Sequence, residues 1–318
     1  MLKYSNISKF FDDNKAVDNI NLQIEPGTIL GLLGRNGAGK TTTVKMGCGL
    51  IEPTCGDIIA FNTSVKKNRK EYLKNIGAVL EGNRNIYWKL TPEENMIYFS
   101  GIRGIKKRKV ESKIKELLTI FDLKDKYDER CENLSRGMQQ KVAICCSLIY
   151  NPQVLFLDEP TLGLDVESVI NIKKIVKELI SKNRIVVVTS HDLKFISEVC
   201  DRVCIIEKGK IVLDKSVEFL ENFYDTIIYN IDIEKNNSKT INKLSTKFKV
   251  KYRNKTKDKL RIKINNNNEI VNIIKFLDNN NIKILNINRV NIELEDIFLD
   301  VINNKQEEWN YEKVTSNI

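Results

Sequence analysis

Eight residues near the N-terminus, GRNGAGKT at 34–41, have the spacing of a loop that binds phosphate. Glycines in such a loop let the backbone turn tightly enough for its N–H groups to surround a phosphate, and a following helix adds partial positive charge. Lys40 is expected to neutralise phosphate oxygens, and the Thr41 hydroxyl to reach Mg²⁺. The alternative, a glycine turn in an unrelated α/β protein, is disfavoured by the apolar strand before the loop and the helical segment after it. The nucleotide-binding set predicted from this region is Gly34, Arg35, Asn36, Gly37, Ala38, Gly39, Lys40, Thr41 and Thr42.

The segment VLFLDEP at 154–160 is an apolar run that ends in two acidic residues. A strand of this kind is expected to deliver both carboxylates beside the bound phosphates. Asp158 is predicted to hold Mg²⁺ through its water shell, and Glu159 to orient and deprotonate the attacking water. Taken alone, an acidic pair after a strand is also compatible with a helix cap, so its role depends on the neighbouring motifs.

The segment LSRGMQQ at 134–140 lies about twenty residues before these acids and resembles the LSGGQ signature of ATP-binding cassette (ABC) proteins. The resemblance extends over the first 221 residues, because PTLGLD at 160–165 is similar to the family's D-loop and TSHD at 189–192 to its switch-histidine loop. The fold that the resemblance implies is α/β, a P-loop NTPase cassette. The activity that it implies is hydrolysis of ATP to ADP and phosphate, coupled to transport.

The resemblance assigns roles to three further residues. His191, the single histidine of the chain, matches the switch histidine that touches the γ-phosphate. Phe11 matches the aromatic residue that stacks on adenine, with an ordinary edge-strand aromatic as the alternative. Glu81 stands where many cassettes have a glutamine that contacts magnesium, and a carboxylate oxygen is able to replace the amide oxygen. The predicted catalytic set is Glu159, His191 and Glu81, and the predicted metal set is Thr41, Asp158 and Glu81.

The resemblance also implies a head-to-tail dimer, homomeric or heteromeric, in which ATP lies between the phosphate loop of one subunit and the signature of the other. Arg136 is a departure from the commonest signature, which has glycine there, and it adds bulk and charge at the dimer seam. The residues predicted to reach the partner's ATP are Ser135, Arg136, Gly137, Gln139 and Asp165.

A separate membrane permease is the second partner that the resemblance implies. The loop after residue 81 is where cassettes receive the permease, and Tyr87 and Trp88 suit such a socket, with core aromatics as the alternative. The ending NIELEDIFLDVI, 291–302, resembles the (L)EDxF segment of drug- and peptide-exporting cassettes, which favours export. A soluble cassette ATPase acting on ribosomes or DNA is the main rival, although such proteins usually carry two cassettes or a long coiled coil. A P-loop kinase or GTPase would not explain the three family motifs.

The elements that must position these residues follow from the periodicity. Short β-branched runs alternate with helical segments at 111–121 and 167–181, which predicts a largely parallel sheet in a first domain over 1–221. The order strand, helix, hairpin, helix, strand then predicts a small ferredoxin-like α+β domain over 222–305, followed by a polar tail at 306–318. The strands expected in the first domain are 28–34, 57–62, 75–81, 154–159, 184–191 and 202–213.

Composition limits the location of the protein. The chain has 318 residues and no apolar stretch near the length of a membrane span, and its start lacks the order of a secretory signal. The seven cysteines show no CxxC pair, which is typical of reduced thiols in a cytosol. We therefore expect a cytoplasmic protein, held at the inner face of the cell membrane through the permease.

The chain has a net charge of +10 and is rich in lysine throughout, and every odd position from 247 to 263 is Lys or Arg. With the period of a β-strand, one face of a hairpin at 248–264, turning at 254–258, is then wholly cationic. Anionic lipid headgroups or an acidic protein surface are the partners that this face favours, and a solvated edge is the alternative. Nucleic acid is disfavoured, because no aromatic platform accompanies the charges. The residues assigned to this contact are Lys249, Lys251, Arg253, Lys259, Arg261 and Lys263.

Overall fold

The chain divides into two compact units, Met1–Val217 and Glu218–Ile318, which are described separately. The computed structural model describes residues 1–82, 85–180, 184–223, 227–234, 250–254, 258–264 and 267–290, together with Leu294 and Phe298.

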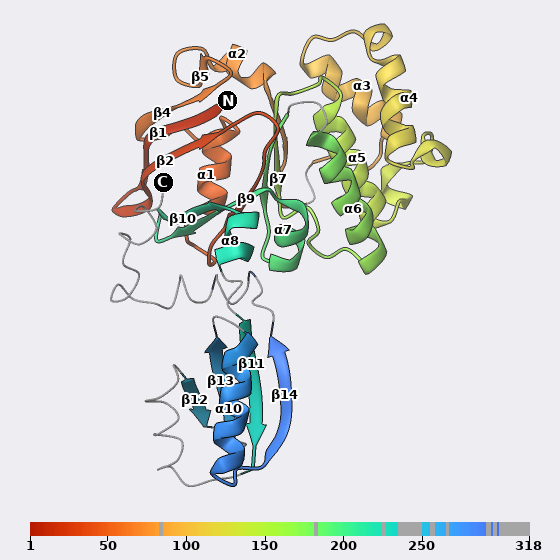
Figure 1. The fold of residues 1–318 in the computed structure, drawn as a ribbon. Coiled ribbons are helices and arrows are strands. Elements are labelled where there is room, and N and C mark those ends of the chain that lie inside the picture. The colour runs from red at the N-terminus through yellow and green to blue at the C-terminus, as the bar shows by residue number, and fades with distance from the viewer. Residues whose placement is uncertain are drawn as a thin grey trace. The chain divides into compact units, whose positions relative to one another are not determined.

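A six-stranded sheet forms the centre of the first unit (Figure 1). Five of its strands are parallel, and the edge strand that precedes the second unit is antiparallel to its neighbour. The α/β fold predicted from alternating strands and helices is confirmed. In sheet order the strands are β10 (Lys210–Ser216), β9 (Arg202–Glu207), β3 (Ile29–Leu33), β8 (Ile185–Thr189), β7 (Val154–Asp158) and β6 (Ile76–Val79).

A second, antiparallel sheet lies beside it in the order β2-β1-β4-β5. The segment 57–62 was expected in the parallel sheet, and this expectation is wrong, because β4 pairs antiparallel with β1 over Leu2↔Ala60 to Ser5↔Asp57. Alternation of apolar residues predicts a strand but not its partner. The long β1–β2 pair was not predicted. The strands are β1 (Leu2–Phe11), β2 (Asn14–Ile24), β4 (Cys55–Ala60) and β5 (Thr63–Ser64).

Several helices of the first unit bury one face, whereas α5 (Arg136–Leu148) is buried at every position from Lys141 to Leu148. Helix α4 (Glu111–Ile120), predicted at 111–121, buries Ile114, Leu117 and Leu118, which recur at three- and four-residue spacing. Helix α3 (Pro92–Ile102) begins at a capping box between Thr91 and Glu94. The other helices of this unit are α1 (Lys40–Gly47), α2 (Arg69–Lys74), α6 (Val166–Leu179) and α7 (Leu193–Val199), with short 3₁₀ turns η1 (Lys107–Lys109), η2 (Lys124–Lys126) and η3 (Cys131–Asn133). Helix α8 (Val217–Phe223) begins at the last residue of the first unit.

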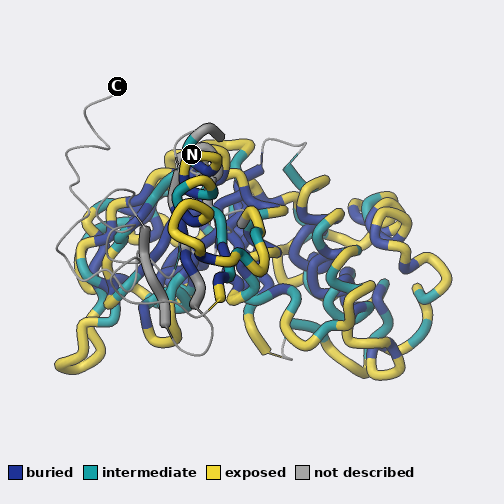
Figure 2. The backbone as a smooth tube through the Cα atoms, turned by 60° about the horizontal axis from the view of Figure 1, so that its bottom comes forward, coloured by how far each residue is buried: buried dark blue, intermediate teal, exposed yellow. Residues whose placement is uncertain are grey.

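Both sheets of the first unit share one apolar core with helix α1. Leu2 and Ile58 of the antiparallel sheet join Met46 of the helix and Leu30 and Phe156 of the parallel sheet in one buried cluster. The tube in Figure 2 shows that buried positions follow the strands, whereas exposed positions lie mainly in the connections. This core holds the ends of the parallel strands in fixed positions.

The second unit contains a four-stranded antiparallel sheet in the order β12-β13-β11-β14. This is the strand order of a ferredoxin-like sheet. Helix α10 (Asn267–Asn279), predicted at 268–279, contributes Ile273 and Leu277 to a buried cluster with the sheet residues Ile231, Leu260 and Ile262. The helix predicted at 238–246 and the tail at 306–318 lie outside the described residues. The strands are β11 (Ile227–Ile233), β12 (Val250–Asn254), β13 (Asp258–Ile264) and β14 (Ile284–Val290).

No helix in the described part of the chain has both the length and the apolar character needed to cross a bilayer. The cysteines are all free thiols, buried except for Cys55.

Candidate functional site

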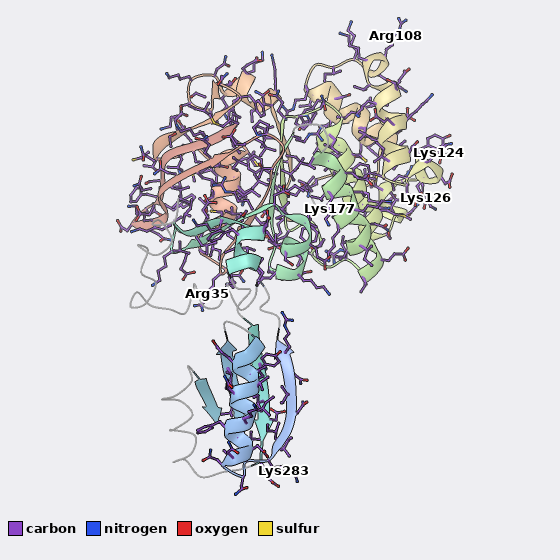
Figure 3. The ribbon with its side chains drawn as sticks, viewed as in Figure 1. Arg35, Arg108, Lys124, Lys126, Lys177 and Lys283 are labelled. Carbon is purple, nitrogen blue, oxygen red and sulfur yellow. The ribbon has the colours of Figure 1, made fainter. Side chains whose placement is uncertain are left out.

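The loop between β3 and α1 has a backbone that only glycine fits at two positions. Gly39 precedes the first residue of α1 with φ of 108°, and a Cβ there would lie 2.6 Å from the Ala16 carbonyl oxygen. A Cβ on Gly34 would lie 2.2 Å from the carbonyl oxygen of Ile206 on β9. Strand β9 therefore fixes the loop from one side. Around it, Arg35, Asn36 and Gly37 are exposed, Arg35 at the surface of the unit in Figure 3, whereas Ala38 is buried and Thr41 and Thr42 are half-buried at the start of α1.

Lys40 lies at the centre of this loop. Its Nζ donates to the Gly34 carbonyl oxygen at 2.7 Å and to that of Arg35 at 3.2 Å, so the ammonium lies inside the loop. Burial lowers the pKa of Lys40, and the carboxylates of Glu159, Asp158 and Glu81 partly oppose this shift. The phosphate loop and the three predicted acidic residues thus belong to one electrostatic site.

Asp158 is the last residue of β7 and is only 3% exposed. Its Oδ1 accepts a hydrogen bond from the Thr189 hydroxyl of β8 at 2.5 Å, because the two residues are paired in the parallel register. Its Oδ2 is buried and has no hydrogen-bond partner in the structure. A buried carboxylate oxygen without a partner is costly unless a cation or donor completes it. This unpaired oxygen fits the hard, oxygen-preferring Mg²⁺ expected beside a nucleotide.

Glu159 and His191, both assigned to the catalytic set from the sequence, lie in contact. The Glu159 Oε2 lies 2.8 Å from His191 Nδ1, with the glutamate side chain 13% exposed and the histidine 69% exposed. Glu159 has φ of 50°, and its N–H donates to the carbonyl oxygen of Thr189 at 3.1 Å and to its Oγ1 at 3.0 Å. The loop after β8 therefore holds both the backbone and the carboxylate of Glu159.

Thr189 is the residue of this site to which sequence reasoning gave no role. Its hydroxyl donates to Asp158 and accepts from the Glu159 N–H, so one side chain fixes both acids. The residue was visible as the first letter of TSHD at 189–192. Its contact with the two acids arises because β7 and β8 are neighbours in the sheet, and this strand order cannot be predicted from the sequence pattern.

A cavity of about 150 Å³ adjoins the acids. Asp158 and Glu159 line it together with Glu81 from the loop after β6, and with Arg136 and Gln139 from the start of α5. Glu81 is exposed at its rim. Two residues predicted to serve the partner's ATP thus also border the acidic end of β7 in their own chain.

The start of α5 carries the signature residues in a capped turn. The Ser135 hydroxyl oxygen accepts from the Met138 N–H at 3.3 Å, and Gln139 Nε2 donates to the carbonyl oxygen of Cys131 at 2.8 Å. Asp165 caps α6 in the same way, because its carboxylate accepts from the Ser168 N–H and hydroxyl, each at 2.9 Å. These hydrogen bonds lower the pKa of Asp165. Both helix starts are thus organised by hydrogen bonds within the chain.

Three aromatic residues singled out from the sequence are exposed. Phe11 ends β1 and is 44% exposed, with Lys9 Nζ 5.2 Å from its ring centroid. The core alternative for Tyr87 and Trp88 is wrong, because they are 49% and 46% exposed. Tyr87 is held by an edge-to-face contact with Tyr98 at 4.6 Å between centroids. An exposed aromatic surface therefore adjoins α3.

The cationic hairpin of the second unit has the predicted alternation. Strands β12 and β13 pair Lys251 with Arg261 and Arg253 with Lys259, so cations occupy directly opposed positions. Lys263 follows on the same face of β13 by the period of two. Lys249, the turn residues 255–257, and the ending 291–302 apart from Leu294 and Phe298 lie outside the described residues.

Comparisons with known proteins agree with this geometry. The family model described as ABC transporter matches residues 17–162. The bacitracin transport ATP-binding protein BcrA of Bacillus licheniformis is 37% identical over 67% of this chain and 68% of its own length. The uncharacterized ABC transporter ATP-binding protein YhcH of Bacillus subtilis is 30% identical over 97% of this chain and 98% of its own length.

Solved structures give the same assignment. A dimeric ATP-binding cassette, MJ0796, in a post-hydrolysis state with ADP and Pi, superposes with a TM-score of 0.61 and 26% identity, over 68% of this chain and 99% of that one. None of these relatives is described as acting on ribosomes or DNA. The chain therefore belongs to the ABC transporter ATP-binding proteins, as an ATP-hydrolysing subunit of a transporter.

Proposed function

We propose that this subunit drives export through a separate membrane permease, and that it hydrolyses ATP at the acidic end of β7. The observation that carries the proposal is the Glu159–His191 pair at 2.8 Å next to the unpaired Oδ2 of Asp158. An ATPase needs a base near the attacking water and a cation site near the phosphates, and this edge provides both.

The residues divide the work of hydrolysis. Lys40 and the loop N–H groups bind the phosphates, and Phe11 stacks on adenine. Asp158, with Thr41 and Glu81, would hold Mg²⁺, which would neutralise charge that develops on the phosphate oxygens. Glu159 accepts a proton from the attacking water, and His191 holds the Glu159 carboxylate in place and contacts the γ-phosphate.

The active form is a head-to-tail dimer with a second subunit of this family. Its support is the preformed start of α5, where Ser135, Gly137 and Gln139 are already organised to meet phosphate at a helix N-terminus. Arg136 and Asp165 complete the surface offered to the partner's nucleotide. The dimeric ADP-bound relative supports the same arrangement.

The permease contact is proposed for the loop around Tyr87 and Trp88, whose exposure suits an interface. This contact would place the subunit in the cytoplasm, at the inner face of the cell membrane. Transport is supported by the name of the bacitracin transport relative, and export by the resemblance of the ending at 291–302.

Trapping the nucleotide-bound form tests the proposal. Glu159→Gln removes the base and retains the shape of the side chain, so the tagged variant should bind ATP and turn it over at least about 100-fold more slowly. Affinity purification in ATP and mass spectrometry should then recover a membrane protein of the permease type. Glu132→Gln, an exposed carboxylate that pairs with Arg130, is the matched control and should hydrolyse ATP normally. Recovery of ribosomes or DNA with the trapped variant would overturn the transport assignment.

A second contact is proposed for the cationic hairpin, with anionic lipid headgroups as its partner. Opposed like charges on β12 and β13 cost about 0.2–1 kcal/mol per pair, which is offset when an anionic surface lies against the face. Reversing Lys251, Arg253, Arg261 and Lys263 to Glu should abolish cosedimentation with phosphatidylserine vesicles. The control reverses the exposed run 106–109, which changes the net charge equally. Equal binding by both variants, or binding equally lost in both, contradicts a specific role for the hairpin.

A further inference from the structure

Arg136, the departure from the commonest signature, contacts a glycine of its own chain. It is the first residue of α5, and a Cβ built on Gly163 would lie 2.7 Å from the Arg136 Nη1 and 3.1 Å from its Cζ. The guanidinium therefore occupies the space that a side chain at residue 163 would need. Gly163 has φ of 70°, a conformation that other residues rarely adopt.

A second close contact joins the same two segments. A Cβ on Gly137 would lie 2.1 Å from the Ser168 Oγ, so the start of α5 packs directly on the start of α6. The Ser168 hydroxyl donates to Asp165, which fixes its position in the turn. The segment 160–168 thus packs against α5 at two points. Ser168 lies close to Gly137, which has no side chain, and Gly163 lies under the guanidinium of Arg136.

The turn that Arg136 covers begins at Glu159. The Leu162 N–H donates to the Glu159 carbonyl oxygen at 3.2 Å, and the Leu164 N–H donates to that of Thr161 at 3.2 Å. Leu162, Leu164, Arg136 and Glu159 all line the cavity of about 150 Å³. A shift of Gly163 therefore displaces a short hydrogen-bonded turn whose first residue is the proposed base.

We propose that Arg136 is a positioning residue for hydrolysis: its guanidinium, packed over Gly163, holds the 159–164 turn and thereby the direction of the Glu159 carboxylate. Glycine at residue 136 would leave this space open and the turn less restrained. The role rests on the proposed function of Glu159, and it concerns the chain's own site as well as the partner's. The rate of the chemical step should depend on Arg136, whereas ATP binding at Lys40 should not.

Hydrogen exchange and kinetics of the full chain test the two halves of this proposal. In Arg136→Gly, peptide amides over 160–165 should exchange at least about tenfold faster without nucleotide, because the turn loses its cover. The kcat for ATP should fall about tenfold, and this fall should exceed any rise in KM, which would report loss of the Arg136 contact with the partner's nucleotide. Arg130→Gly removes a cation six residues earlier, on an exposed side chain, and should change neither quantity.

A double-mutant cycle separates this contact from general destabilisation. Gly163→Ala places a methyl group against the guanidinium and also strains the backbone, so kcat should fall in the wild-type background. In the Arg136→Gly background the additional fall should be at least about fivefold smaller, since the overlap is gone.

Three outcomes overturn the proposal: unchanged exchange in Arg136→Gly, faster exchange with unchanged kcat, or effects of the two substitutions that simply multiply. If Glu159→Gln retains full turnover, the proposed function fails instead, and the exchange result still decides whether Arg136 restrains the turn.

Discussion

The acidic end of β7 and the sheet of the second unit place charged residues in opposite ways. In the first, Asp158 ends a buried strand and Glu159 follows it, both bond the Thr189 hydroxyl, and both act electrostatically on Lys40. In the second, cationic residues occupy mid-strand positions that are paired in register with other cationic residues, as with Lys251 and Arg261. The end of a strand and its turn fix the positions of single atoms, as catalysis requires. The face of a strand repeats like charges at regular intervals, which favours contact with an extended charged surface.

Removal of the charge from Asp158 is expected to have the largest effect. Asp158→Asn keeps the acceptor for Thr189 but replaces the oxygen that has no partner with an amide NH2 group, which does not ligate a cation, so kcat should fall at least about 100-fold. Steady-state ATPase assays of the full chain measure this. Asp125→Asn, an exposed carboxylate, is the control and should leave kcat unchanged. A fall in kcat of less than tenfold would contradict a direct role of Asp158 in ATP hydrolysis.

Truncating the core of the second unit should separate the two regions. Leu260 is 1% exposed, and Leu260→Ala should lower the free energy of unfolding of the second unit by about 2–5 kcal/mol. ATPase activity of the first unit should change less than twofold. Denaturant unfolding followed by hydrogen exchange reports each unit separately, with Leu285→Ala, at a 53% exposed position, as the control. A parallel loss of ATPase activity would contradict the separation.

The pH dependence of kcat/KM should show a smaller effect that belongs to the first region alone. Lys40 must be protonated to neutralise phosphate, and burial lowers its pKa, so the proton is lost before the ordinary lysine value of 10.5 is reached. Raising the pH should therefore lower kcat/KM along a limb with its midpoint below 10.5. A limb with its midpoint at or above 10.5 would contradict this assignment to Lys40.

The sequence predicts local features of the site better than its contacts. The loop at 34–41 and the strands that end at Leu33 and Asp158 follow from spacing and apolar runs, which act within one segment. The placement of β4 in the antiparallel sheet does not, because strand periodicity is the same in either sheet. The role of Thr189 and the cover of Gly163 by Arg136 were missed for the same reason, since each depends on which segments pack together.

Through Thr189, the parallel pairing of β7 and β8 fixes the positions of Asp158 and Glu159. The Thr189 Oγ1 lies 2.5 Å from Asp158 Oδ1 and 3.0 Å from the Glu159 nitrogen, so one hydroxyl group fixes the position of both the proposed cation ligand and the proposed base. A slip of one residue between the strands would turn the hydroxyl to the opposite face and separate both acids from it. The register between β7 and β8 thus determines the positions of the Asp158 and Glu159 carboxylates relative to each other.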